Sequence, residues 1–301
     1  MIKMWGKHWG MTEGSWVCCG WIAVGMLLQM LVGPVRWDMM AWPVNAAVLA
    51  VLLLCIVLMY LLRGRFRLFQ WMATLQAGIP AMVTCAMMTV LMGVTRQVPS
   101  GHVPIEPIGI TAMLSFWPFV LSYLWLTLLV GLVCVTRIFH PSWRSIPFLL
   151  NHLGLFLALV AGTLGNADMQ RLFLTAQEGK TERLAVDAQH RVHELPIAIE
   201  LHDFSITKAP ALSFLSDVTV YTKGGTTVRD TIRVNKPLSV HGWKIYQYSY
   251  DEAKGGMSDI SIFELVRDPW LPYVYCGIFM MLTGAIQTLS NSPLKGKKRG
   301  N

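Results

Sequence analysis

The chain has 301 residues, of which 54% are hydrophobic and 14% are charged, and its mean hydropathy is positive. This composition excludes a soluble enzyme and predicts an integral membrane protein with one polar insert. The formal net charge of +8 lies in short loops and tails, because the insert between Asp168 and Asp268 holds 12 basic and 14 acidic residues. A nucleic-acid partner is therefore not expected.

Six hydrophobic runs are long enough to cross a bilayer, since about 20 apolar residues span a hydrocarbon core of about 30 Å. In chain order they cover about residues 15–32, 43–62, 71–94, 116–135, 144–168 and 270–289. Pro80 lies inside the third run and predicts a kink or a later helix start. The sequence predicts an α-helical, polytopic membrane protein of about six spans.

The basic residues predict the sides of the membrane. If the N-terminus is cytoplasmic, the two short outside loops hold only Arg36 and Arg96. Eleven basic residues then lie inside, namely Lys3, Lys7, Arg63, Arg65, Arg67, Arg137, Arg144, Lys295, Lys297, Lys298 and Arg299. This distribution follows the positive-inside rule and predicts cytoplasmic termini and an extracytoplasmic insert.

The insert has the pattern of an antiparallel β-domain. Five segments alternate between apolar and polar residues and are rich in β-branched and aromatic side chains, as in SDVTVYT and GWKIYQYSY. Lys223, Gly224 and Gly225 predict a hairpin turn. We expect five or six strands in a small sandwich or barrel. The predicted division is residues 1–167 for helices one to five, 168–268 for the β-domain, and 269–301 for the last helix and a basic tail.

The sharpest functional signal is His152, the single ionisable side chain among the 23 residues between Arg144 and Asp168. An ionisable group inside a span is a functional-site hypothesis by default. His152 lies about two turns inside one membrane face, on a bulky apolar side of the helix. The opposite side carries small residues that allow close helix packing, namely Asn151, Gly154, Ala158, Ala161, Gly162 and Gly165. His152 is either a cofactor ligand or an interfacial histidine bonded to a loop carbonyl.

Two other groups of residues give weaker signals. His190, His193, Glu194 and His202 lack the spacing of a zinc motif, so we interpret the histidines as solvated strand residues. The six cysteines all lie in hydrophobic runs and form no C-x-x-C pair. Neither a disulfide nor thiol exchange chemistry is expected.

Two stretches resemble the ResB (CcsB) family of system II cytochrome c biogenesis proteins. The first, HPSWRSIPFLLNHLGLFLALVAGTLGNADMQRLFLTAQEG, is similar to the family's histidine-bearing span and its G-x-x-D exit turn. The second, VNKPLSVHGWKIYQYSYD, matches a strand and turn motif in register at Asn235, Pro237, Leu238, Gly242, Tyr246, Gln247, Ser249 and Tyr250. The Trp-rich haem-handling motif of the family's partner subunit is absent, and Trp5, Gly6 and Trp9 do not reproduce it.

The resemblance implies a part in carrying haem across the inner membrane to exported apocytochrome c, together with a CcsA/ResC-type partner that holds the Trp-rich motif. It implies that His152 is an axial ligand to the iron of a haem b. This haem would bind transiently at a site shared with the partner. A neutral imidazole on an apolar helix face suits that role. No residue of this chain stands out as a bond-making catalyst.

Two other classes of function stay open at this stage. A transporter or sensor could use His152 as a proton relay, although the chain lacks the intramembrane carboxylates and broken helix pairs of coupled transporters. A structural scaffold would use the β-domain only to dock a partner. Bound b-type haem in purified membranes would distinguish the haem-delivery hypothesis from both of these classes.

Overall fold

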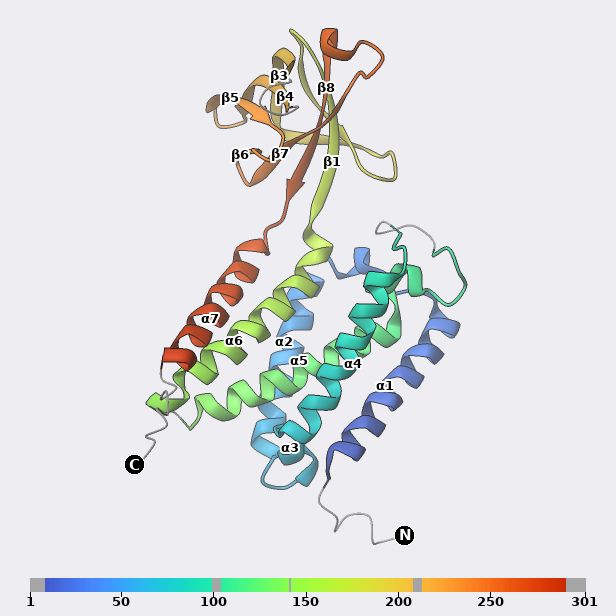
Figure 1. Cartoon of the computed structure of the whole chain (residues 1–301), viewed down its shortest axis with the longest axis vertical. Helices are drawn as coiled ribbons and strands as arrows, with labels where there is room; N and C mark the ends of the chain where they lie inside the picture. The colour runs from blue at the N-terminus through green and yellow to red at the C-terminus, as the bar shows by residue number, and fades with distance from the viewer. Residues whose placement is uncertain (1–8, 99–103, 141, 208–212, 291–301) are drawn as a thin grey trace, which may run out of the picture. The chain divides into compact units, whose positions relative to one another are not determined.

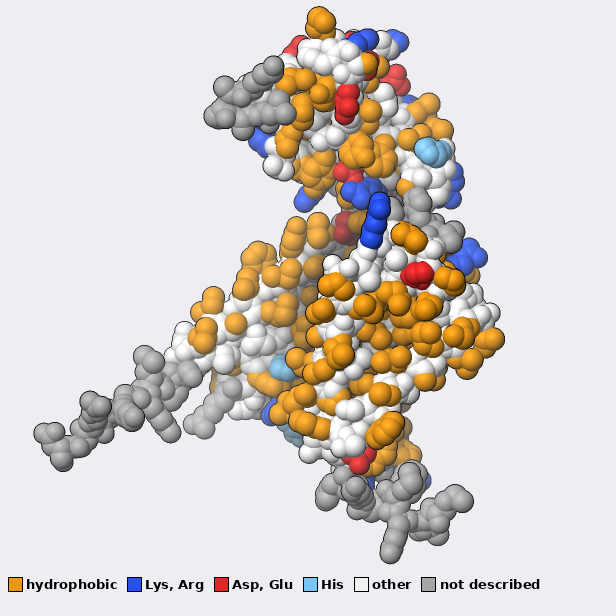
Figure 2. Space-filling model, turned by 45° about the vertical axis from the view of Figure 1, so that its right-hand side comes forward, with side chains coloured by type: hydrophobic (Ala, Val, Ile, Leu, Met, Phe, Trp, Pro, Cys, Tyr) orange, Lys and Arg blue, Asp and Glu red, His pale blue; other side chains and the backbone are white. Residues whose placement is uncertain are grey.

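The computed structural model describes residues 9–98, 104–140, 142–207 and 213–290, and it divides into two compact units (Figure 1). One unit comprises Met1–Ala167 with Leu271–Asn301, and the other comprises Asp168–Trp270. Basic residues of the sidedness argument before residue 9 and after residue 290 lie outside the described part. Within the helical unit, hydrophobic side chains cover most of the surface seen in Figure 2.

The described residues contain six helices that are long and apolar enough to cross a membrane. They are α1 (Met11–Val32), α2 (Val44–Leu62), α4 (Leu75–Val94), α5 (Trp117–Ile138), α6 (Ile146–Leu164) and α7 (Leu271–Ser290). The predicted helical membrane protein is confirmed. The chain is a multi-pass membrane protein by the length and composition of these helices.

The third span begins later than its hydrophobic run. A short helix, α3 (Arg67–Met72), takes the start of the run, and α4 begins only at Leu75. Thr74 separates the two helices with an extended backbone. Pro80 then lies inside α4, so this span both starts late and contains an internal proline.

Helix α5 lies at the centre of the helical unit, where it contacts α1, α2, α4 and α6. Its buried side includes Trp125, Leu129 and Leu132, which pack with residues of α1, α3 and α4. Helix α7 packs along α6, as Figure 1 shows. The buried Asn45 of α2 donates a hydrogen bond to the carbonyl oxygen of Leu164 on α6, at 3.2 Å. This polar contact fixes α2 against the end of α6.

The β unit is one antiparallel sheet of eight strands in the order β5-β4-β3-β2-β1-β8-β7-β6. The prediction of five or six strands missed β1, β2 and the three-residue β6. The strands are β1 (Gln170–Gln177), β2 (Thr181–Val186), β3 (Val192–Thr207), β4 (Ser213–Thr222), β5 (Thr227–Arg233), β6 (Leu238–Val240), β7 (Trp243–Tyr250) and β8 (Ile260–Arg267). The hairpin turn predicted at Lys223–Gly225 joins β4 to β5 and has Gly225 at φ 79°.

The sheet curls until its two edges approach each other, since β5 at one edge contacts β6 and β7 near the other. Of the predicted sandwich or barrel, the single, nearly closed sheet therefore resembles the barrel. Alternate residues point inward, as Leu172, Leu174 and Ala176 of β1 show. They meet inward residues of the other strands in one core, which includes Trp243 and Phe263. The domain thus has a hydrophobic core of its own.

We expect residues 168–268 expressed alone to fold, because this core and all eight strands lie within one unit. The circular dichroism spectrum should be of the β type and unchanged by chelator or reductant, since the unit contains no cysteine. A spectrum that requires zinc would contradict this expectation and would revive the histidine cluster as a metal site.

Candidate functional site

Helix α6 begins with a proline in its first turn, where the missing N–H group costs no hydrogen bond. The following residues are apolar or small, and the helix continues to Leu164 without an internal break. His152 lies in its second turn and is half-buried. It therefore stands near the end of the helical unit where α5 connects to α6.

Within the part of the chain that the structure describes, the His152 ring has one polar contact. Its Nδ1 lies 2.8 Å from the carbonyl oxygen of Phe148, one turn earlier on the same helix. A carbonyl oxygen only accepts, so Nδ1 carries the proton and donates it. In the neutral ring Nε2 is then the unprotonated nitrogen, with its lone pair available. This is the tautomer that metal-binding histidines use when a backbone carbonyl orients them.

The ring of Phe148 also packs on the His152 imidazole. The two rings stack with their centroids 3.8 Å apart and their planes 24° apart. The Phe148 ring in turn lies 5.1 Å from the guanidinium carbon of Arg137, in the last turn of α5. Farther along α6, Phe156 packs against Gly131 of α5. The bulky face of α6 that carries His152 is thus the face turned toward α5.

The opposite face of α6 packs closely on α7, as its small residues predict. A Cβ atom added at Gly154 would lie 2.5 Å from the carbonyl oxygen of Gly277, and one added at Gly277 would lie 2.5 Å from that of Gly154. A Cβ atom added at Gly284 would likewise lie 2.7 Å from the carbonyl oxygen of Pro147 and 2.9 Å from the side chain of Asn151. Gly162 differs, because a Cβ there would meet nothing within 4 Å. The close contacts with α7 therefore extend along α6 from Pro147 to Ala158.

The same end of the helical unit carries a second histidine contact. Arg63, which follows α2, donates a hydrogen bond to Nε2 of His140 at 2.9 Å and lies over the ring of Tyr60. Tyr60 stacks on Phe139. His140 is exposed and its Nε2 is already an acceptor, so it is a poorer metal ligand than His152.

The family-like motif in the insert forms the β5–β6–β7 turns and one end of the curled sheet. Asn235 adopts φ 63° in the turn after β5, and Gly242 adopts φ 83° in the two-residue turn between β6 and β7. Pro237 comes just before the edge strand β6, where its missing N–H group is tolerated. Tyr246 lies opposite Glu264 of β8. The motif residues therefore serve to form the turns and to set the pairing of the strands.

Gln247 and Tyr250 join strands that are not neighbours in the sheet. The Gln247 Oε1 atom accepts hydrogen bonds from Ser216 of β4, at 2.6 Å, and from Ser261 of β8, at 3.1 Å. Both serines are fully buried. The Tyr250 ring stacks on Phe204 and packs in a tilted arrangement against Phe214, each with centroids 5.1 Å apart. Together they close one end of the β unit with satisfied polar groups.

The two ends of the insert are also joined. Asp168, the acid of the G-x-x-D turn, accepts a hydrogen bond from the Trp270 indole at 2.7 Å. Strands β1 and β8, which follow and precede these residues, pair along their whole length. The chain thus enters and leaves the β unit through adjacent strands.

The histidines of the insert make separate contacts. His193 Nε2 lies 2.9 Å from Asp187 Oδ2, and His202 Nε2 lies 2.6 Å from the hydroxyl of Thr219. The His193 contact, with further hydrogen bonds from Arg191, holds the pKa of Asp187 well below its usual range. His190 adopts φ 60° in the turn between β2 and β3. Among the residues that the structure describes, no three potential metal ligands come together.

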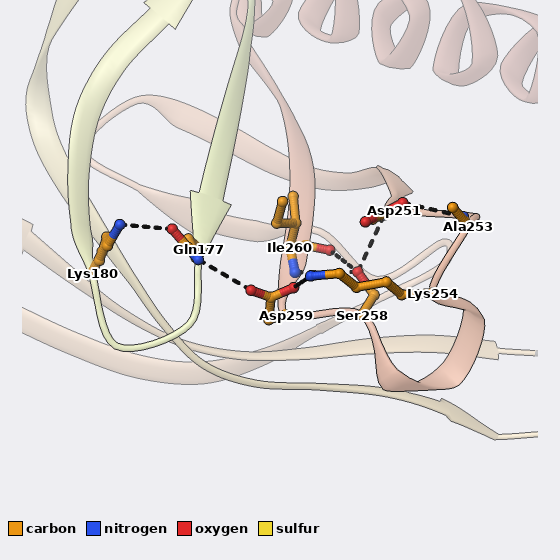
Figure 3. Close-up of polar contacts among 8 residues, drawn as sticks. All are labelled: Gln177, Lys180, Asp251, Ala253, Lys254, Ser258, Asp259 and Ile260. Atoms are coloured by element: carbon orange, nitrogen blue, oxygen red, sulfur yellow. Dashed lines mark hydrogen bonds and ion pairs between the residues drawn. The ribbon is translucent and has the colours of Figure 1, made fainter.

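A polar cluster lies where the β1–β2 turn meets the β7–β8 loop (Figure 3). Asp259 accepts hydrogen bonds from Lys254 and, at 3.1 Å, from Gln177. These bonds, that of Lys254 first, lower the pKa of Asp259 to about 2. Its carboxylate stabilises the fold above the ordinary pKa of 3.8, and this contribution is lost as the pH falls through about 2. The cluster stabilises the β7–β8 loop, and within it Asp259 and Lys254 are already paired.

One comparison with known proteins, that with family models, agrees with the resemblance seen in the sequence. The model of the ResB-like family matches residues 141–263, a range that includes α6 with His152 and most of the β unit. No match was found among curated proteins. One similar solved structure is described as "Cytochrome c Heme Lyase CcmF", with 12% sequence identity and a TM-score of 0.36 over 72% of this chain. The chain spans 35% of the length of that protein.

Proposed function

We propose that this chain is a ResB-like component of cytochrome c biogenesis that helps to carry haem across the membrane to exported apocytochrome c. The family match over residues 141–263 supports the biogenesis role. The observation that carries the haem hypothesis is the 2.8 Å contact between Nδ1 of His152 and the Phe148 carbonyl oxygen, which leaves the lone pair of Nε2 available on an apolar helix face. A CcsA/ResC-type protein with the Trp-rich motif is the proposed partner.

The residues around His152 fit haem as a cargo. Haem iron accepts an imidazole nitrogen as an axial ligand, and the porphyrin is a flat apolar ring that needs apolar side chains around it. The His152 side of α6 supplies both, with Leu155 and Leu159 one and two turns farther along. The Phe148 carbonyl and ring orient the imidazole. The partner would supply the second axial ligand.

The direct test is an absorption spectrum of the purified full-length protein, alone and with its partner, from haem-replete cells. We expect a b-type haem spectrum that depends on His152. Absence of haem from both preparations would contradict the proposal and would favour the transporter, sensor or scaffold classes.

Transport toward an exported apocytochrome requires that the β unit lie outside the cytoplasm. We expect fusions of an export-dependent reporter to be active after residues 38 and 105 and anywhere from 170 to 265, in agreement with the positive-inside rule. Fusions after residues 65 and 140 should be inactive, because these connections carry Arg63 and Arg137. Activity at either of those two positions would overturn the arrangement.

A further inference from the structure

Arg137 is a basic residue whose surroundings differ from those of Arg63, which lies at the same end of the helical unit. Its guanidinium is exposed and lies over the ring of Phe148. Among the described residues, no carboxylate lies within ion-pair distance of it. Arg63, by contrast, already bonds to His140 and lies over Tyr60. The guanidinium of Arg137 is therefore free to bind an anionic group.

This guanidinium lies near His152, because both groups contact the ring of Phe148. One ring, that of Phe148, stacks on the His152 imidazole at 3.8 Å and lies 5.1 Å from the Arg137 guanidinium carbon. The guanidinium carbon is thus no farther from the imidazole centroid than the sum of these two distances.

We propose that Arg137 is a positioning residue that binds a propionate carboxylate of the haem held by His152, an inference that rests on the proposed function. Haem carries its two carboxylates on one edge, and the rest of the ring is apolar. A guanidinium binds a carboxylate through two parallel hydrogen bonds, which fix orientation as well as affinity. Arg137 therefore sets the direction in which the haem edge points, toward the end of the helical unit that carries the α5–α6 connection.

The test compares haem b with its dimethyl ester, in which both carboxylates are blocked, on the full-length protein in phosphatidylcholine nanodiscs. The Arg137→Gln variant should bind haem about tenfold more weakly, the effect expected for loss of a charge-assisted hydrogen bond. Its affinity for the dimethyl ester should equal that of the unmodified protein. Arg137→Lys should recover part of the affinity for haem, because it keeps the charge but loses the bidentate geometry.

Two controls separate this role from others. Arg65→Gln removes a charge from another connection of the helical unit and should leave both affinities unchanged. The absorption spectrum of bound haem should be the same in Arg137→Gln as in the unmodified protein, since His152 still ligates the iron. A shifted spectrum, or an equal loss for haem and ester, would mean that Arg137 only supports Phe148 and would overturn the proposal.

Three further results would also overturn it. Equal haem affinity in Arg137→Gln and the unmodified protein would mean that the guanidinium does not bind the carboxylate. An effect seen only in anionic phosphatidylglycerol nanodiscs would assign Arg137 to lipid headgroups. If the unmodified protein binds neither haem nor the ester, both alone and with its partner, the proposed function itself fails and this inference with it.

Discussion

Replacing His152 with alanine should lower the haem content of the purified protein at least about tenfold, because even the loss of a residue that supports a metal ligand costs about 10- to 100-fold in affinity. Maturation of c-type cytochromes should fall with it. Insertion and the β unit should stay intact, since α6 is otherwise strongly apolar and the two units have separate cores. Haem content, measured as pyridine haemochrome per protein, checks the expectation.

Externally added imidazole should restore part of both the haem content and the maturation, because it fills the vacant ligand position. His140→Ala and His190→Ala are matched controls. His140 is exposed and bonded to Arg63, and His190 is exposed in a turn of the β unit, so each should have a small effect. Full haem and full maturation in His152→Ala would mean that His152 is only an interfacial residue bonded to the Phe148 carbonyl.

Replacing Gly154 with alanine should destabilise the helical unit by about 1–3 kcal/mol, the usual cost of overpacking a close contact. The added Cβ would lie 2.5 Å from the carbonyl oxygen of Gly277 and 3.0 Å from side-chain atoms of Met280 and Met281. Backbone oxygen cannot move aside as a flexible side chain can, so α6 and α7 must separate. The melting temperature of the protein in detergent measures the loss.

Gly162→Ala on the same helix is the control, because a Cβ at that position meets nothing within 4 Å. It should leave the melting temperature unchanged or raise it slightly, since alanine is the better helix former. Gly277→Ala should behave like Gly154→Ala, as the two glycines face each other. Equal melting temperatures for Gly154→Ala and Gly162→Ala would show that the α6–α7 contact is not close in solution.

The sequence by itself determined the features that depend on local pattern. The lengths of the apolar runs placed all six long helices, and the small residues of α6 predicted the close contact at Gly154. Alternation predicted β3, β4, β5, β7 and β8 but missed β1 and β2, and glycines predicted the turn before β5. It could not show β6, because three residues are too few for a period to be read. These properties are local, since each depends on residues within a few turns or one strand of each other.

Only the tertiary structure decided which distant residues meet. The sequence identified His152, but nothing in its own helix indicates that Phe148 stands between it and Arg137 of another helix. The motif residue Gln247 was noted without a role, and only the curling of the sheet brings it to Ser216 on a strand that is not its neighbour. Such contacts depend on how elements pack, because a periodic pattern tells which face of an element is buried and not which partner covers it.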